Sequence, residues 1–386
     1  MKFEFIEDFL KEAKKNDNFR TLRNIVPFSA RKCIADGRRC LNFSSNDYLG
    51  LSNHPDVIAE STKWVNKYGA GSGASRLVTG TIDAYENLEN EIAEWKGAEA
   101  ALIFGSGFLA NSGMIPALAG HGTEVFADKL NHASLNAGCR LSDGDFKRFR
   151  HNDLGHLEKL LEKSAGSSRK LIVDETIFSM DGDMSDVEGL QKIAQKYDAI
   201  LYLDDAHGSG LFGARGEGLA NPSACDIAMG TFSKALGSYG AYAACSKELR
   251  DYFINSCGSF IYSTALPPAV CGAISAALKI VQSPESSEIR TALQKKAAKL
   301  RSSLQELGFD TGESSSHIIP VVLGSSETTM KVSKFFYENN ILVTGIRPPT
   351  VPAGKARVRI TVNAIHTEED MALLIKKFKE IKEKIS

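Results

Sequence analysis

A lysine and an aspartate each follow a short apolar run, in an order that is chemically specific. The run AILYLDD ends in Asp204 and Asp205, and the next apolar run leads to Lys234 in GTFSKALG. This is how pyridoxal 5′-phosphate (PLP) is usually held, because the lysine forms a Schiff base with its aldehyde and a carboxylate pairs with its protonated ring nitrogen. Taken alone, Lys234 is more typical of an exposed loop. The DDAHG segment upstream favours a cofactor site, since the chemistry needs both groups.

The segment IFGSGFLAN follows a predicted strand and is expected to open a helix. Its residues 105–108 would present backbone N–H groups at a helix N-terminus, which suits a phosphate. The segment is neither a Walker loop nor GxGxxG. The hydroxyls of Thr231 and Ser233, which flank Lys234, could join the same phosphate site, although Thr231 could equally just end a strand.

Two histidines lie near these residues in the sequence. His132, in ADKLNHASL, could lie flat against a pyridine ring or could be a loop histidine bonded to the backbone. His207 could reach the phenolic oxygen of the ring. Asp204 and Asp205 compete for the ring nitrogen, because adjacent strand residues point to opposite faces, and the sequence pattern does not choose between them.

Three arginines near the end of the chain, Arg347, Arg357 and Arg359, are candidate anion binders. Arg357 and Arg359 alternate along a predicted strand and share a face, with Val358 opposite. A guanidinium group binds a carboxylate through two parallel hydrogen bonds, as an amino-acid substrate would require. The alternative, for one of these two arginines, is a solvated strand face.

The elements that must position these residues alternate between β-rich runs and helical patterns from about Asn42. Expected helices cover residues 83–97 and 187–198, and the expected strands are 100–105, 124–128, 169–175, 199–205, 225–230 and 241–246. This alternation predicts an α/β fold with a mostly parallel central sheet covered by helices on both faces. Sites of such sheets lie at the carboxyl ends of the strands, where Asp204 and Lys234 are expected.

The pattern predicts three parts along the chain. Residues 1–41 form an N-terminal amphipathic helix and arm, which would pack on the main body or on a partner subunit. Residues 42–284 form a large α/β domain, and residues 285–386 form a smaller α+β domain. In the last helix Met371, Leu374, Ile375 and Phe378 share one face, and Thr367 is placed to cap it.

The composition is that of an ordinary globular protein. The chain has 386 residues, 43% of them hydrophobic and 24% charged, and a net charge of −1, which gives no basic footprint for nucleic acid. The seven cysteines have no CxxC spacing, so we expect neither a disulfide framework nor a metal site. No apolar run reaches membrane-spanning length and no signal peptide is visible, so we expect a cytoplasmic protein with no membrane partner.

Over nearly its whole length the sequence resembles the α-oxoamine synthases, which are PLP-dependent enzymes of fold type I that condense an amino acid with an acyl thioester and release CO2. The motifs that carry the resemblance occur in the family order: LNFSSNDYLGLS, YGAGSGASRLVTGT, FGSGFLANSG, DKLNHASL, ETIFSMDGD, LDDAHGSG, GTFSKALG, YSTALPPA and RPPTVPAGKARVRIT.

The resemblance implies roles for the residues around the cofactor. Lys234 would be the Schiff-base lysine and the catalytic base, and Asp204, not Asp205, would be the partner of the ring nitrogen. His132 matches the stacking histidine and His207 the residue near the phenolic oxygen. Further matched cofactor contacts are Gly107, Phe108, Ser179 and Thr231.

Other implied roles concern the substrates and a second subunit. Arg359 matches the arginine that binds the substrate carboxylate, and Asn46 lies in the NDYLG motif near the substrate. Arg20 lies where members that act in biotin synthesis have an arginine near the acyl chain. Because the family is dimeric with shared sites, Ser263 or Thr264 would reach the phosphate of the neighbouring subunit.

Within the family, RPPTVPAG most resembles the members of biotin biosynthesis. The implied reaction is the condensation of L-alanine with pimeloyl-CoA, or with pimeloyl-acyl carrier protein. Alternatives are glycine C-acetyltransfer from acetyl-CoA, the serine palmitoyltransferase reaction and, from a different class, a non-catalytic PLP-binding sensor. Amino-acid pockets that differ by one methyl group discriminate by only about 1–3 kcal/mol, so the amino acid cannot be inferred from the pocket residues alone.

Overall fold

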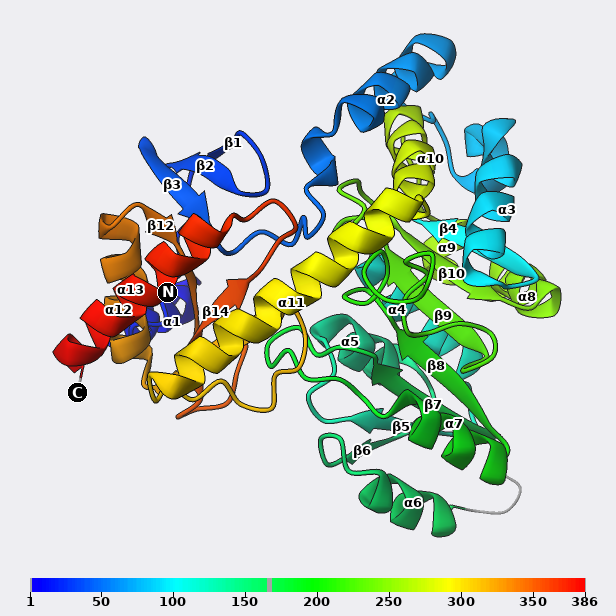
Figure 1. Ribbon diagram of the computed structural model, residues 1–386. Helices are drawn as coiled ribbons and strands as arrows, with labels where there is room; N and C mark the ends of the chain where they lie inside the picture. The colour runs from blue at the N-terminus through cyan, green and yellow to red at the C-terminus, as the bar shows by residue number, and fades with distance from the viewer. Residues whose placement is uncertain (1, 165–168, 386) are drawn as a thin grey trace. The chain divides into compact units, whose positions relative to one another are not determined.

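The computed structural model describes residues 2–164 and 169–385, which form two compact units. Unit 1 consists of Met1–Gly50, Met180–Asp183 and Thr291–Ser386, and unit 2 consists of Leu51–Ser179 and Met184–Arg290. The division expected from the sequence, at residues 41/42 and 284/285, stays a prediction. Both chain termini belong to unit 1 (Figure 1).

Unit 2 contains a sheet of seven strands with the order β4-β10-β9-β8-β7-β5-β6. The strands β5 to β9 are parallel to one another, and β10 runs antiparallel to both of its neighbours. The bounds are β4 Ala100–Phe104, β5 Thr123–Asp128, β6 Asp145–Phe149, β7 Arg169–Glu175, β8 Ala199–Asp204, β9 Ile227–Thr231 and β10 Ala241–Cys245. All six predicted strands are present, and the mostly parallel sheet is confirmed.

The strand β6, DFKRF, was not predicted. It lies at the edge of the sheet, where Lys147 and Arg148 give it the polarity of a solvated segment. Charged side chains are common on edge strands because they discourage pairing with another chain.

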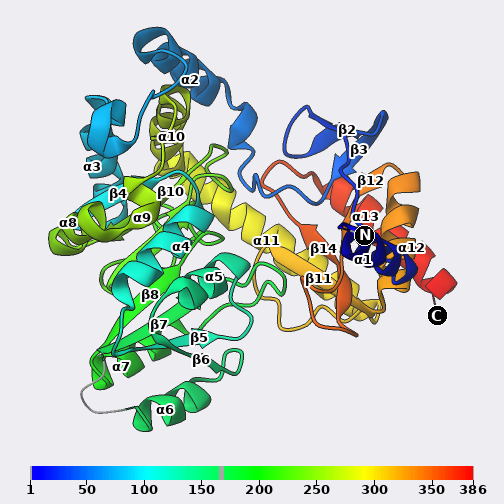
Figure 2. The ribbon, with the colours of Figure 1, turned by 180° about the vertical axis from the view of Figure 1, so that it is seen from behind.

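Helices cover both faces of this sheet, as Figures 1 and 2 show from opposite sides. One face packs on α4, α5, α8 and α9 through a core that includes Met114, Leu135 and Phe253, and α3 and α7 contact strands on the other. The bounds are α2 Pro55–Tyr68, α3 Ala84–Lys96, α4 Gly107–Leu118, α5 Ala133–Leu141, α6 Leu154–Glu162, α7 Val187–Lys196, α8 Lys247–Ser256, α9 Gly258–Ile261 and α10 Pro268–Val281, with short turns at Leu51–Asn53 and Arg76–Gly80. Both predicted helices, α3 and α7, are present.

Unit 1 contains two smaller sheets, β1-β2-β3-β12 and β11-β14-β13. Val358 and Ile360 of β14 pack with Phe336 and Phe378 in one apolar core. The strands are β1 Ile25–Pro27, β2 Lys32–Ala35, β3 Arg38–Asn42, β11 Ile318–Gly324, β12 Ile341–Leu342, β13 Thr344–Ile346 and β14 Ala356–Thr361. The helices are α1 Glu4–Lys15, α12 Ser326–Glu338, α13 Glu368–Ile385 and part of α11 Pro284–Glu306, which contains the boundary to unit 2.

The two end helices of the chain differ in their packing. In α13 the Thr367 hydroxyl accepts a hydrogen bond from the Asp370 backbone N–H at 3.3 Å, which confirms the predicted cap, and Met371, Leu374 and Phe378 are buried. The helix α1 buries none of its residues, and the side chains of Phe5 and Phe9 are about 70% exposed. The expected packing of α1 on the main body or on a partner subunit stays a prediction.

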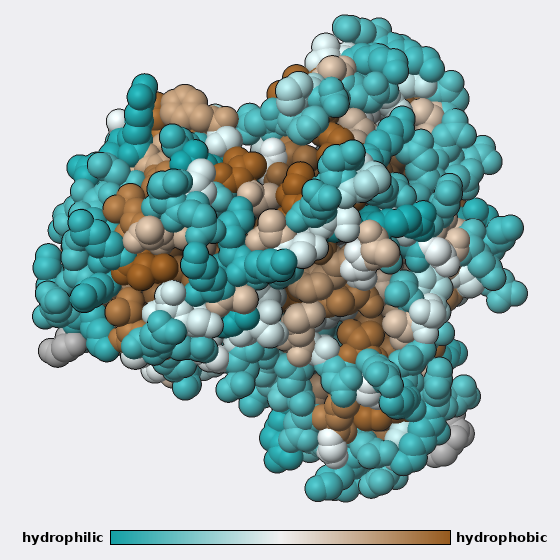
Figure 3. All heavy atoms as spheres, viewed as in Figure 1, coloured by the Kyte–Doolittle hydropathy of each residue, from teal (hydrophilic) through white to brown (hydrophobic). Residues whose placement is uncertain are grey.

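The surface drawn in Figure 3 is mostly hydrophilic, and its apolar side chains form several separate groups. Among the helices of the described residues, none is long and apolar enough to cross a bilayer. All seven cysteine thiols are free and buried. The cytoplasmic location expected from the sequence stays a prediction.

Candidate active site

The ends of β8 and β9 bring the predicted lysine and aspartate to the same edge of the sheet in unit 2. β8 ends at Asp204 and β9 ends at Thr231, and the two strands are parallel neighbours. Lys234 Nζ donates a hydrogen bond to Thr231 Oγ1 at 3.1 Å. Thr231 therefore both ends a strand and contacts the lysine, and the carboxyl edge carries an amine and a carboxylate.

The structure gives Asp204 and Asp205 different surroundings. Asp204 Oδ2 accepts a hydrogen bond from Asn111 Nδ2 at 2.8 Å, and its Oδ1 accepts one from the Ala206 backbone N–H at 3.0 Å. The Asp205 carboxylate faces the opposite way, where it pairs with Lys96, whose side chain is fully buried. These surroundings favour Asp204 as the partner of a bound ring nitrogen.

Asp205 is instead the centre of a buried polar network. Its Oδ1 accepts from Thr176 Oγ1 at 2.6 Å, and its Oδ2 accepts from Ser209 Oγ at 3.0 Å and lies 3.4 Å from Lys96 Nζ. The backbone passes so close that a Cβ atom at Gly218 would lie 1.8 Å from Asp205 Oδ2. The network therefore fixes the loop after β8, which carries His207.

A chain of hydrogen bonds connects Asp204 with His132. Asn111 Nδ2 also donates to Ser134 Oγ at 2.9 Å, and Ser134 Oγ lies 2.7 Å from His132 Nδ1. Asn111 Oδ1 accepts from the hydroxyl of Tyr202 at 2.6 Å, so every polar atom of this buried amide is used. Asn111 was not predicted from the sequence; the available signal was a polar amide in the largely apolar helix GFLANSGMIPAL.

His132 is the N-cap residue of α5, and its Nδ1 accepts a hydrogen bond from the Ser134 backbone N–H at 3.3 Å. One ring nitrogen of His132 is therefore bonded to the backbone, as in the alternative considered from the sequence. The residue is nevertheless exposed, so a face of its ring can still contact a ligand. Burial of the imidazole among protein atoms lowers the pKa of His132, and so does the charge of Lys234. The charge of Asp204 raises this pKa, but by less than burial lowers it. A neutral ring is suited to stacking on a pyridine.

The predicted phosphate segment opens a helix as expected. α4 begins at Gly107, and the Ser106 hydroxyl accepts from the Leu109 backbone N–H at 3.2 Å. A Cβ atom at Gly107 would lie 2.7 Å from Thr231 Cγ2, so only glycine allows the helix N-terminus to approach the end of β9 this closely. The backbone N–H groups of Gly107 and Phe108 thus lie near the Lys234 loop, as a phosphate bound there would require.

The remaining predicted cofactor contacts also lie in unit 2. His207 is buried in the loop after β8, and Ser179 follows β7 and is half-buried. Ser263 and Thr264 line a small cavity together with Gly105, next to the start of α4. Their proposed contact with a neighbouring subunit is not tested by a single chain.

The predicted substrate residues lie in unit 1. Arg359 on β14 is buried, and its Nη1 donates to Asn46 Oδ1 at 3.1 Å. Tyr48 donates from its hydroxyl to the same oxygen at 3.1 Å, and the ring of His317 meets the ring of Tyr48 edge-on with a centroid distance of 4.1 Å. Burial raises the pKa of Tyr48 to about 12, and burial together with the charge of Arg359 lowers the pKa of His317 to about 3. Arg359 is therefore the one cation of this group.

The alternative that one of the two β14 arginines lies on a solvated strand face is wrong. Neither lies on a solvated strand face: Arg357 is only 4% exposed and Arg359 only 7%. Arg357 Nη1 pairs with Asp181 Oδ1 at 2.5 Å and donates to the Met180 carbonyl at 3.1 Å. The DGD segment after β7 supplies this partner, so Arg357 is already occupied by a carboxylate of the chain.

Three further arginines, Arg20, Arg23 and Arg347, line a cavity of about 510 Å³ in unit 1. Arg20 and Arg347 lie at this cavity together with the apolar side chains of Leu22, Met330 and Ile346. Arg20 donates to Thr350 Oγ1 at 3.3 Å, and burial and the charge of Arg20 lower the pKa of Arg347. Arg23 pairs with Asp36, and both residues also line the cavity. A cavity with apolar side chains and further guanidinium groups suits a chain that carries an anion.

The unit 2 residues fit PLP. Asp204 supplies a carboxylate for the ring nitrogen, Lys234 an amine for the aldehyde, and the start of α4 a phosphate site that a side chain at Gly107 would fill. No other part of the chain was predicted to hold the cofactor.

Comparison with known proteins shows the family of this chain. The aminotransferase class I and II family matches residues 38–378. A protein of Paramagnetospirillum magneticum named putative 8-amino-7-oxononanoate synthase is 50% identical over 362 residues, which cover 92% of each chain. The 8-amino-7-oxononanoate synthase of Geobacter sulfurreducens is 46% identical over 366 residues, which cover 94% of each chain. The chain belongs to the α-oxoamine synthase family of PLP-dependent enzymes.

Solved structures support the same family and its fold type I. A serine palmitoyltransferase from S. paucimobilis, solved with PLP and myriocin bound, matches with a TM-score of 0.92 at 27% identity, over 100% of this chain and 98% of the other. The fold and family expected from the sequence are thus confirmed.

Proposed function

We propose that this protein is a PLP-dependent C-acyltransferase of biotin biosynthesis that condenses L-alanine with a pimeloyl thioester, delivered by CoA or by acyl carrier protein. The products are 8-amino-7-oxononanoate, CO2 and the free thiol. Relatives at 46–50% identity that carry the name of this synthase support the proposal. The observation in the structure that carries it is the apolar cavity with Arg20 and Arg347.

The cofactor is PLP, which when bound withdraws electrons from the α-carbon of the amino acid. Lys234, next to Thr231 at the end of β9, is placed to take the α-proton and to return one at the end of the reaction. Asp204, held by Asn111, keeps a proton on the ring nitrogen. General base catalysis by one well-placed group contributes roughly 100- to 10,000-fold to the rate.

We propose that Arg359 binds the carboxylate of the amino acid. Its buried guanidinium group donates a hydrogen bond to Asn46, and Tyr48 and His317 stay neutral beside it. Because Arg357 is already paired with Asp181, Arg359 is the better candidate of the two.

The cavity in unit 1 favours an acyl chain that ends in a carboxylate. An acetyl group would leave the cavity empty, and a palmitoyl chain would bring methyl groups against the cations of Arg20 and Arg347. A pimeloyl chain would place methylenes along Met330 and Ile346 and its terminal carboxylate at the arginines, where charge-assisted hydrogen bonds are strong.

The test compares pimeloyl-CoA with heptanoyl-CoA, which has the same chain length without the terminal carboxylate. We expect wild-type protein to prefer pimeloyl-CoA, and Arg347→Gln to raise the KM for pimeloyl-CoA by roughly 10- to 150-fold, the value of a hydrogen bond to a charged group. The KM for heptanoyl-CoA should not change. Arg39→Gln, on β3 and away from the cavity, is the matched control. Equal KM values for both thioesters in the wild type would contradict the assignment of the cavity.

We also propose a homodimer with shared sites. Unit 2 exposes apolar side chains near the predicted phosphate residues: Val78 is 73% and Tyr262 is 86% exposed. Tyr262 directly precedes Ser263 and Thr264. Mixing Lys234→Ala subunits with Ser263→Ala/Thr264→Ala subunits should restore part of the activity in heterodimers. A fully active monomer in light scattering would rule out shared sites.

A further inference from the structure

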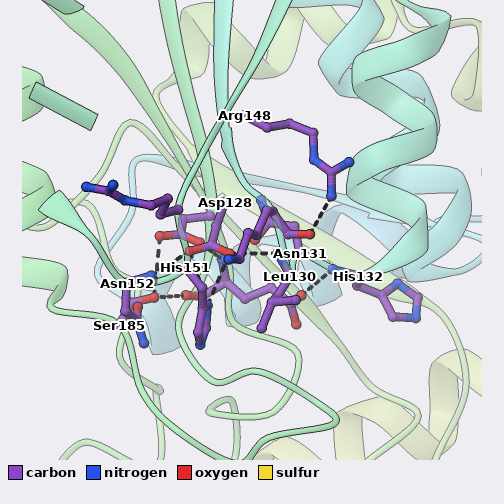
Figure 4. Close-up of polar contacts among 12 residues, drawn as sticks. Asp128, Leu130, Asn131, His132, Arg148, His151, Asn152 and Ser185 are labelled. Atoms are coloured by element: carbon purple, nitrogen blue, oxygen red, sulfur yellow. Dashed lines mark hydrogen bonds and ion pairs between the residues drawn. The ribbon is translucent and has the colours of Figure 1, made fainter. Parts of the chain in front are cut away.

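The loop that carries His132 is tied to the sheet at several points (Figure 4). At its start, Asp128 accepts hydrogen bonds from the backbone N–H groups of Leu130 at 2.7 Å and of Asn152 at 2.8 Å, and lies 3.1 Å from His151 Nδ1. In its middle, Asn131 Nδ2 donates to the Val173 carbonyl at 2.8 Å. The His132 ring points away from the Asp128 and His151 side chains.

A buried carboxyl group holds the end of the loop. The backbone N–H of His132 donates to Glu175 Oε1, at the last residue of β7. Glu175 is 3% exposed. Because His132 is also the N-cap of α5, its backbone position sets where its ring lies. No role was predicted for Glu175 from the sequence.

Glu175 is also the strand neighbour of Asp204. The two residues are register partners in the parallel strands β7 and β8, so their side chains leave the same face of the sheet. Two buried carboxylates side by side are not both ionised readily. Burial first, and then the charge of Asp204, raise the pKa of Glu175 well above its usual range. Glu175 is therefore suited to act as a neutral acid.

We propose that Glu175 is a positioning residue that holds the His132 ring over the cofactor through its acceptor oxygen and not through a charge. This inference rests on the proposed function, since it assigns a task to a residue beside the PLP site. It makes a distinctive prediction: an amide, which has the same acceptor oxygen and no charge, should replace the carboxyl group.

Three substitutions separate the acceptor from the charge. Glu175→Gln keeps the acceptor, Glu175→Asp keeps an acid but shortens the reach by one methylene, and Glu175→Ala removes both. Ser185→Ala is the matched control, because the Ser185 hydroxyl bonds to the Glu175 carbonyl at 2.6 Å without touching the His132 loop. The measurements are the PLP dissociation constant, from reconstitution of the apoprotein followed by absorbance, and the visible circular dichroism of bound PLP, which reports the orientation of the ring.

We expect Glu175→Gln and Ser185→Ala to bind PLP within about twofold of wild type with an unchanged dichroism band. Glu175→Asp and Glu175→Ala should bind PLP roughly 5- to 150-fold more weakly, since they remove the acceptor of the His132 N–H. Wild-type affinity and dichroism in Glu175→Asp, or a loss in Glu175→Gln as large as in Glu175→Ala, would overturn the proposal. Both measurements use PLP without substrates, so they stay informative even if the protein proves to use a different amino acid or thioester.

Discussion

Asn substitutions at the adjacent residues Asp204 and Asp205 should affect different properties, the first the rate of the reaction and the second the stability of the fold. Asp204→Asn is expected to slow the reaction with little loss of stability, because the residue can still accept the Ala206 N–H hydrogen bond. Asp205→Asn is expected to destabilise unit 2, because Asp205 is the buried counter-charge of Lys96.

The size of the second effect follows from the two oxygens of Asp205. Oδ1 accepts from Thr176 and the Leu219 N–H, whereas Oδ2 faces Lys96 and Ser209. An amide can keep the Oδ1 contacts only if its NH2 group faces the buried ammonium. Breaking a buried ion pair by removing one partner costs about 3–5 kcal/mol. For Asp204→Asn the loss of one hydrogen bond should cost only about 1 kcal/mol.

The assay is urea unfolding followed by tryptophan fluorescence. The chain has two tryptophans, Trp64 and Trp95, both in unit 2, and Trp95 is fully buried next to Lys96. In a Trp64→Phe background the signal reports the surroundings of the Lys96–Asp205 pair. Lys96→Met combined with Asp205→Asn should recover part of the loss, since it removes the unpaired ammonium. A loss below about 1 kcal/mol in Asp205→Asn would refute the reasoning about the buried pair.

Further outcomes are expected at four other positions. Arg359→Ala should lower kcat/KM for the amino acid by roughly 10- to 150-fold with little change in the KM of the thioester, while Arg357→Ala should affect it less; equal losses in both would contradict the assignment. Lys234→Ala should lower kcat by roughly 100- to 10,000-fold and change the absorbance of bound PLP, and full turnover would exclude Lys234 as the base. His317 has a folded pKa of about 3, below its unfolded value of about 6.5, so the unfolded state binds the proton first and stability falls by about 1.4 kcal/mol per pH unit as the pH drops below 6.5. His317→Gln should reduce this slope in urea unfolding between pH 6 and 4, and an unchanged slope would mean that the pKa of His317 is not lowered in the fold.

Much of unit 2 could be predicted because its strands are buried on both faces. Runs such as AALIF and IAMGT contain few polar residues, and turns and helical patterns bound them. The motif residues at the strand ends, Asp204 and Lys234, could be located for the same reason. The edge strand β6 escaped prediction because its charged side chains resemble a loop.

The residues that hold the site in place could not be predicted from local patterns. Asn111, Glu175 and Lys96 lie 93, 29 and 109 positions from their partners Asp204, Asp204 and Asp205, and only the folded sheet brings them together. The same applies to Arg357, whose partner Asp181 is 176 positions away, and whose burial the alternating pattern of β14 did not reveal.

The proposed activity is tested most directly by CoA release from three substrate pairs: L-alanine with pimeloyl-CoA, glycine with acetyl-CoA, and L-serine with palmitoyl-CoA. We expect the first pair to give the highest kcat/KM, with equal amounts of CoA and CO2 and a product with the mass of 8-amino-7-oxononanoate. Faster CoA release with either of the other pairs would contradict the proposed substrates, while the fold and family would stand.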